Sequence, residues 1–145
     1  MASPLCPATG APMTRGKKQL TLVYKGESIT FDMPGWYCDS SDQGIHSGED
    51  MKVSDRILNR LKARVEGLLE PEEIRRIRKK LELSQSAAGE LIGGGPRAFQ
   101  KYERGDLLPS RAISSALVLL DYQPQTLGIL KARSASHLKK VRATG

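Results

Sequence analysis

The chain has 145 residues, of which 39% are hydrophobic and 5% aromatic, and a formal net charge of +7 at neutral pH. This length has room for one ordinary domain or two small ones, and the change in composition near residue 50 favours two. No segment has the length and apolar content of a membrane span, and no basic stretch precedes an apolar one as in a signal peptide. We therefore expect a cytoplasmic protein that does not contact a membrane.

The excess of positive charge lies at the end of the chain. Residues 1–65 contain nine Lys/Arg and seven Asp/Glu, residues 66–130 nine and nine, and residues 131–145 five and none. The five are Lys131, Arg133, Lys139, Lys140 and Arg142. For this basic tail, residues 132–145 with Lys131 before them, two roles stay open: a disordered solubilising end, or a contact with DNA or RNA.

The first part of the chain, residues 1–50, predicts a small antiparallel β unit. After a loop over residues 1–18, apolar and polar residues alternate over 20–24 and again over 29–33. Lys25-Gly26 between these runs indicates the turn of a β-hairpin.

Further along the same unit, Pro34-Gly35 predicts the end of the hairpin and Trp36-Tyr37 the start of a third short strand. Residues 39–48 are acidic and rich in Ser and Gly, so we expect a loop. Three short strands bury little apolar surface, and such a unit needs a metal, a disulfide or a partner to be stable.

Residues 51–70 predict a linker helix. Ser54 or Asp50 can open it, apolar residues recur at intervals of three and four, and Glu70-Pro71 ends it.

Five helices are expected in residues 71–131. Pro71 starts the first, Ser84 caps the second, and Pro96 starts the third after three glycines. Ser110 caps a fourth, whose apolar content suits either a central core helix or a helix that pairs with a second copy. A last short helix runs from Pro124 to about Leu130.

The third of these helices has two different faces. Ala98, Phe99 and Tyr102 form an apolar stripe that faces inward. The side chains that point elsewhere are basic or amide: Arg97, Gln100, Lys101 and Arg104.

This segment resembles the helix-turn-helix of Xre/Cro-type repressors. The shared features are Leu83-Ser84-Gln85, Ala88, the glycine turn, Phe99 and Tyr102-Glu103-Arg104-Gly105. The turn is one residue longer than in most such domains, and together with the sequence that follows it is similar to the MqsA-type antitoxins. The fold class implied is α+β, with an N-terminal β unit, a linker helix and an all-α helix-turn-helix domain.

In that family the N-terminal domain binds zinc through two Cys-x-x-Cys pairs and grips a ribonuclease toxin. Here the matching positions are Cys6 and Thr9, and Cys38 and Ser41. Hydroxyl groups are poor zinc ligands, so we expect a degenerate site without zinc and a protein with no cofactor. Two alternatives stay open. One is a mixed metal site in which Cys6 and Cys38 are joined by Asp39, Asp42 or His46. The other is a disulfide between Cys6 and Cys38.

The resemblance also implies a homodimer that binds a double-stranded DNA operator. By position in the motif, Arg97 and Lys101 read bases and Gln100 assists with adenine. The expected phosphate contacts are Gln85, Tyr102, Arg104, Ser110 and Arg111. The expected dimer interface is Ile113, Leu117 and Leu120 on the fourth helix.

No catalytic motif is present, because the chain has no Ser/His/Asp order, no paired carboxylate motif and no phosphate-binding loop. We therefore expect a transcriptional repressor that neutralises a toxin and regulates its own operon, not an enzyme. Two other interpretations stay open: an Xre-type regulator without a toxin, and an adaptor associated with a ribosome or coactivator.

Overall fold

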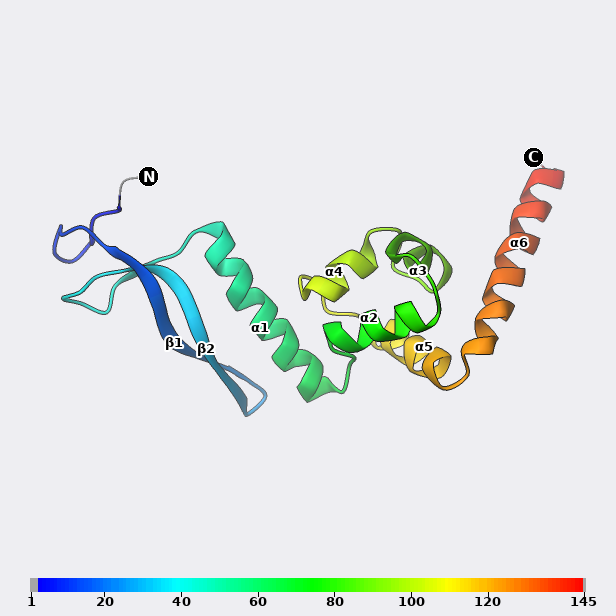
Figure 1. The fold of residues 1–145 in the computed structure, drawn as a ribbon, viewed down its shortest axis with the longest axis horizontal. Helices are drawn as coiled ribbons and strands as arrows, with labels where there is room; N and C mark the ends of the chain where they lie inside the picture. The colour runs from blue at the N-terminus through cyan, green and yellow to red at the C-terminus, as the bar shows by residue number, and fades with distance from the viewer. Residues whose placement is uncertain (1–2, 145) are drawn as a thin grey trace. The chain divides into compact units, whose positions relative to one another are not determined.

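The computed structural model describes residues 3–144 and divides the chain into two compact units with their boundary between Leu61 and Lys62. A three-stranded antiparallel sheet is followed by six α-helices in this described part, which confirms the predicted α+β class (Figure 1). The elements are β1 Thr14–Tyr24, β2 Glu27–Tyr37, β3 Gly44–Ile45, α1 Gly48–Glu66, α2 Pro71–Lys80, α3 Gln85–Leu91, α4 Ala98–Arg104, α5 Arg111–Tyr122, the 3-10 helix η1 Pro124–Thr126 and α6 Leu127–Thr144.

The predicted hairpin is confirmed, and it is longer than expected. Strands β1 and β2 pair along their full length, from Thr14 opposite Tyr37 to Tyr24 opposite Glu27. Lys25 and Gly26 both have positive φ, 48° and 82°, as a tight two-residue hairpin turn requires.

The predicted end of the hairpin at Pro34-Gly35 is wrong, because both residues lie inside β2. Strand β3 pairs only with Trp36 and Tyr37, so at Pro34 the strand has a sheet neighbour on one side only. Proline is tolerated at such an edge position. The third strand is therefore Gly44–Ile45, within the region expected to be a loop, and not the segment at Trp36.

Helix α1 begins earlier than the sequence predicted. The Ser47 hydroxyl accepts from the Asp50 amide at 3.2 Å, and the Asp50 carboxylate accepts from the Ser47 amide at 2.9 Å. This reciprocal cap places the start at Gly48, so neither Asp50 nor Ser54 is the cap. Asp50 also accepts from both terminal nitrogens of Arg15, which ties the start of α1 to β1.

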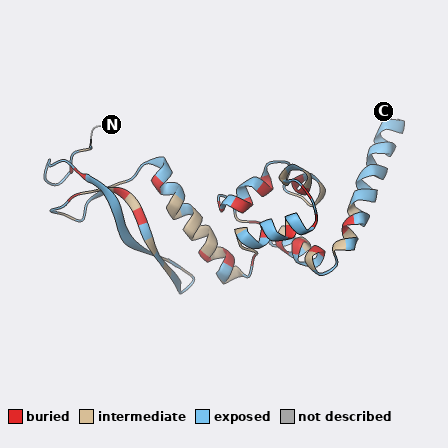
Figure 2. Ribbon diagram, in the orientation of Figure 1, coloured by how far each residue is buried: buried red, intermediate tan, exposed pale blue. Residues whose placement is uncertain are grey.

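The second unit has one apolar core, built from α2, α3, α4, α5 and the start of α6 (Figure 2). Its fully buried large side chains are Ile74, Ile77, Phe99 and Leu117. Ser114 is also buried, and its hydroxyl accepts from the Leu69 amide at 2.9 Å, which fixes the segment between α1 and α2 against α5.

The expected last short helix is much longer than predicted. Helix α6 continues through the basic tail to Thr144. Leu127 is buried in the core, whereas all residues from 131 to 143 are exposed. The tail is therefore a helix that continues beyond the core, and the alternative of a disordered end does not hold for its described residues.

Candidate nucleic-acid interface

The turn between α3 and α4 depends on glycine for two separate reasons. Gly93, Gly94 and Gly95 all have positive φ, 142°, 94° and 92°. Gly89 has an ordinary helical backbone, but a Cβ there would lie 1.8 Å from the Gly95 carbonyl oxygen. The Gly95 amide also donates to the Gly89 carbonyl at 3.1 Å. The close approach between α3 and the glycine turn is therefore made at Gly89.

Helix α3 begins as predicted, because the Ser84 hydroxyl accepts from the Ala87 amide at 3.1 Å. Helix α4 begins later than predicted. Its first residue is Ala98, and Arg97 is the N-cap with φ −105° and ψ −5°. Pro96 therefore lies in the turn and not in the first turn of the helix.

The two faces of α4 are separated as the sequence predicted. The inward face is buried and consists of Ala98, Phe99, Tyr102 and Glu103. The outward face is exposed and consists of Arg97, Gln100, Lys101 and Arg104. Within residues 3–144, no hydrogen bond or ion pair engages the side chains of Arg97 and Lys101, so their charges face solvent.

Glu103 is the residue that sequence reasoning missed. Its side chain is fully buried, and its two oxygens accept from Nε and Nη2 of Arg78 at 2.7 and 2.8 Å. Arg75 and Gln85 also donate to it, each at 3.3 Å. Burial alone would raise the pKa of Glu103, but these donors, Arg78 first, lower it overall. One carboxylate thus joins α2, α3 and α4.

Four of the five expected phosphate contacts already have structural roles. Gln85 donates to Glu103, Tyr102 is 5% exposed in the core, and the Ser110 hydroxyl caps α5 by accepting from the Ile113 amide at 3.2 Å. Arg111 donates to the Glu66 carbonyl at 2.6 Å, at the end of α1. Arg104 is the member of the set whose side chain lies exposed beside Lys101.

The expected dimer residues lie on the inner side of α5. Leu117 and Leu120 are 0% and 5% exposed, and Ile113 packs against the same core. The exposed apolar side chains of α5 are Val118, Leu119 and Tyr122, of which Leu119 and Tyr122 are 69% and 84% exposed. The apolar content of this helix suited either a core helix or a helix that pairs with a second copy. In the structure the three residues predicted for pairing lie in or against the protein's own core.

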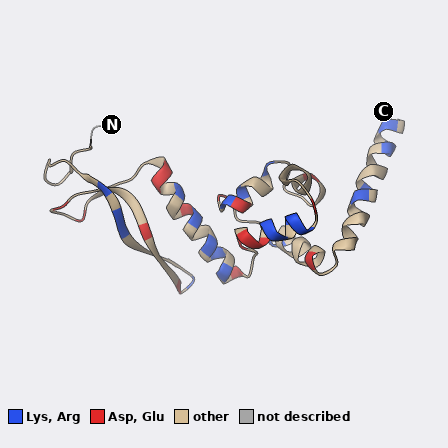
Figure 3. Cartoon of the chain, viewed as in Figure 1, with Lys and Arg blue, Asp and Glu red and all other residues tan. Residues whose placement is uncertain are grey.

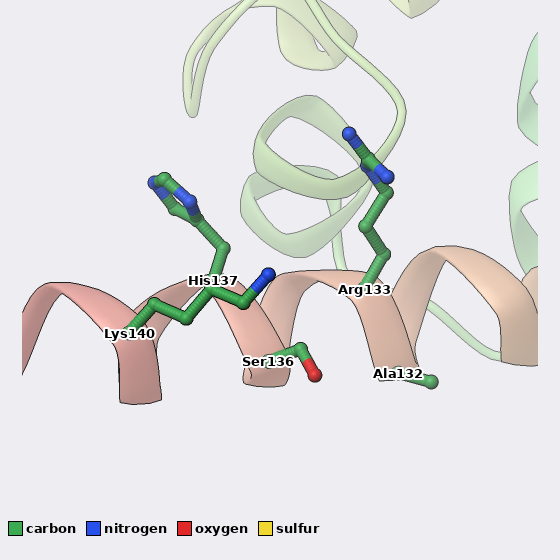
Figure 4. A pocket seen from close by; sticks show the side chains of 5 residues that line it. All are labelled: Ala132, Arg133, Ser136, His137 and Lys140. Atoms are coloured by element: carbon green, nitrogen blue, oxygen red, sulfur yellow. The ribbon is translucent and has the colours of Figure 1, made fainter.

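The distal part of α6 is a second basic surface. Figure 3 shows α6 with basic bands and no acidic one. Arg133, His137 and Lys140 line a shallow hollow with Ala132 and Ser136. In Figure 4 Arg133 and His137 project from the same side of the helix. No helix within residues 3–144 is long and apolar enough to cross a membrane.

The positions matched to zinc ligands do come together in the first unit. The Cys6 sulfur lies 3.6 Å from the Ser41 hydroxyl, and the Cys38 sulfur lies 3.6 Å from Thr9 Oγ1 and 3.5 Å from Ser40 Oγ. Both cysteines are buried and reduced. Hydrogen bonding from Cys6, and then from Ser40 and Ser41, lowers the pKa of Cys38 to about 6.

These residues do not fit a structural zinc ion. Such sites use four thiolate, imidazole or carboxylate ligands, and two of the four donors here are hydroxyls. In the described part of the chain, no three His, Cys, Asp or Glu side chains come together as a metal site. His46, one alternative ligand, instead places Nδ1 2.9 Å from the Pro34 carbonyl oxygen.

Comparisons with known proteins define the class. The sequence model of a family described as the antitoxin component of a bacterial toxin-antitoxin system, MqsA, matches residues 1–131. The protein named Antitoxin MqsA from Escherichia coli (strain K12) is 30% identical over 133 residues, which cover 90% of this chain and 100% of that relative. The protein is therefore an antitoxin component of a toxin-antitoxin system.

More narrowly, the chain belongs to the MqsA antitoxin family, as the resemblance in sequence predicted. The family match ends at residue 131, within α6, so the distal part of this helix lies outside it.

Proposed function

We propose that the chain is a non-enzymatic repressor that binds duplex DNA through the outer face of α4. The supporting observation is the division of α4: its inner residues anchor it in the core, and Arg97, Gln100 and Lys101 are exposed together on the opposite side. The guanidinium of Arg97 suits guanine O6 and N7, and Lys101 reaches the same edge or a phosphate. Of the expected phosphate contacts, Arg104 is the best placed.

The test is binding to the DNA upstream of the gene itself and to a random duplex of equal length. Arg97→Ala is expected to cost about 1–3 kcal/mol on the upstream DNA and much less on the random duplex. Lys79→Ala, which removes an exposed lysine from α2, is the matched control and should leave the ratio unchanged. An equal loss on both duplexes would show that Arg97 does not read bases. Stronger binding to structured RNA than to duplex DNA would favour an adaptor.

We propose that the DNA-binding form is a homodimer joined through the exposed side of α5. Val118 and Leu119 line a hollow with Gly67 and Ser115, and Tyr122 lies one turn beyond Val118. Apolar side chains exposed as a group are typical of an interface. Leu119→Glu should therefore give a monomer in light scattering, whereas Met51→Glu on α1, also at an exposed apolar position, should leave the dimer intact. A dimer that persists in Leu119→Glu would refute this interface.

We further propose that residues 1–50 bind the cognate toxin and that the complex represses its own operon. Two features support a protein partner on this unit: Leu20 and Val23 are 41% and 66% exposed on β1, and β1 is an edge strand of the sheet. Co-purification with the product of the adjacent gene is the test. Leu20→Lys with Val23→Lys should abolish co-elution while DNA binding is kept. Co-elution that is unaffected would place the toxin elsewhere, and no co-elution of the wild type would favour a regulator without a toxin.

A further inference from the structure

Two short loops face each other in the first unit: residues 6–11, here called the first knuckle, and residues 38–43, the second knuckle. Each cysteine lies beside a hydroxyl of the other pair: Cys6 beside Ser41, and Cys38 beside Thr9, at 3.6 Å in both cases. Both thiols also lie in one buried cluster with Met13, and Cys6 is the largest cause of the lowered pKa of Cys38. The two cysteines therefore share one cluster although positions 9 and 41 carry hydroxyls.

Local packing holds this arrangement in place. Cys6 and Cys38 are 2% and 4% exposed and form a small apolar cluster with Met13, against which Trp36 and Ile45 pack. The Cys6 amide donates to the Ala11 carbonyl at 2.8 Å, which closes the first knuckle. The second knuckle is closed by the Cys38 amide, which donates to the Gln43 carbonyl at 3.3 Å.

We propose that Cys6 and Cys38 form a reversible disulfide, which replaces the cross-link that a metal ion would supply between the same two knuckles. A disulfide requires its two Cβ atoms to lie close together. Here the two cysteines share one buried cluster and each is held by its own short loop, so a small movement of either loop would bring the sulfurs into bonding distance. A bond between Cys6 and Cys38 would join the segment before β1 to the segment after β2. It would add stability to a sheet unit that three strands alone stabilise weakly.

The oxidant is a hydroperoxide. With hydrogen peroxide, one thiolate attacks a peroxide oxygen and the oxygen–oxygen bond breaks. The thiolate becomes a sulfenic acid, and the hydroxide that leaves takes up a proton to give the first water. The second thiol attacks the sulfenic sulfur, the sulfur–sulfur bond forms and a second water leaves. Two thiols lose two electrons and two protons in total, and one peroxide is reduced to two waters. Because the second thiol lies in the same buried cluster, this step competes with further oxidation to sulfinic acid.

The test uses the full-length chain, purified in the reduced state and exposed to hydrogen peroxide. Intact mass spectrometry should show the loss of two hydrogen atoms per chain, and non-reducing peptide mapping should show the peptide with Cys6 linked to that with Cys38. A dithiol reductant should restore the original mass. The oxidised chain should also unfold at a higher temperature in the transition followed by fluorescence of Trp36, the single tryptophan.

Matched variants separate pairing from simple reactivity. Cys6→Ser and Cys38→Ser should each lose the two-hydrogen change and instead gain oxygen on the remaining cysteine. The proposal is overturned if the wild type gains oxygen rather than losing hydrogen, if it forms only disulfides between chains, or if both thiols stay reduced while the single variants oxidise. It is also overturned if the reduced chain retains one equivalent of zinc after dialysis against a weak chelator. None of these outcomes depends on DNA or toxin binding.

Discussion

Removal of the Glu103 carboxylate should destabilise the second unit more than removal of any exposed ion-pair partner. Glu103→Ala leaves the guanidinium of Arg78, whose side chain is 13% exposed, without its carboxylate partner. Removal of one member of a buried pair costs about 3–5 kcal/mol. A unit of this size has a total stability of roughly 5–10 kcal/mol, so about a third to a half or more of it would be removed.

The assay is thermal unfolding followed by far-ultraviolet circular dichroism. At about 4–8 °C per kcal/mol, the expected fall in Tm is at least about 12 °C. Asp121→Ala is the control, because Asp121 also accepts from two basic side chains, Arg76 and Lys80, but these are 56% and 45% exposed. Its effect should be several-fold smaller, since surface pairs contribute little. Equal falls in Tm in the two variants would refute the argument that burial makes the Glu103 pair decisive.

Three other predictions follow from the geometry. Gly89→Ala should abolish the folded second unit or lower its Tm far more than Gly95→Ala. An added Cβ at 89 would clash with a backbone oxygen, whereas a Cβ at 95 has open space and is disfavoured only by the positive φ. Equal effects in thermal unfolding would contradict this. Arg15 and the Ser47 amide lower the pKa of Asp50, so its contribution to stability is complete above the ordinary Asp pKa of 3.8 and is lost as pH falls below it; acid titration followed by Trp36 fluorescence should show this loss, and Asp50→Asn should remove it. Deletion of residues 132–145 should reduce the salt dependence of DNA binding by about one unit of slope for each phosphate that α6 neutralises, and an unchanged slope would show that α6 does not bind DNA.

The sequence predicted those features that depend on local pattern. The hairpin followed from period-2 alternation around Lys25-Gly26, and the two faces of α4 followed from the helical period around Phe99. Both patterns are set by neighbours a few residues apart, so no information from the rest of the fold was needed.

Contacts between distant residues were not predictable in this way. Glu103 lies in a polar run, Tyr102-Glu103-Arg104, where a carboxylate is most often solvated. Its burial is made favourable by donors distant in sequence, of which Arg78 is the most important. The pairing of Arg15 with Asp50 is of the same kind. The one available signal for Glu103 was its place in the family motif, where the resemblance gives it no role.

For a related reason, the sequence did not show that the predicted dimer residues of α5 belong to the core. Helix α5 is apolar on more than one side, and sequence alone does not say which side the rest of the chain covers. The structure places Leu117 inside and Leu119 outside. Similarly, the basic composition of the tail left its conformation open, because residues that favour solvation also have high helix propensity, and α6 extends through it.

The separation of the two faces of α4 has a consequence for specificity. The inner face is fixed by the core around Phe99 and by the Glu103 network, whereas no side-chain hydrogen bond or ion pair within the described chain holds Arg97 or Lys101. Substitutions at Arg97 and Lys101 should therefore change which base pairs are preferred without lowering Tm, because they remove no packing and leave no buried group without a partner. Lys101→Asn, for example, should keep the Tm of the parent while the preferred duplex in a binding selection shifts from guanine towards adenine at one position. An altered Tm in this variant would mean that the outer face is part of the structural framework, and the division between a fixed inner face and a variable outer face would then be wrong.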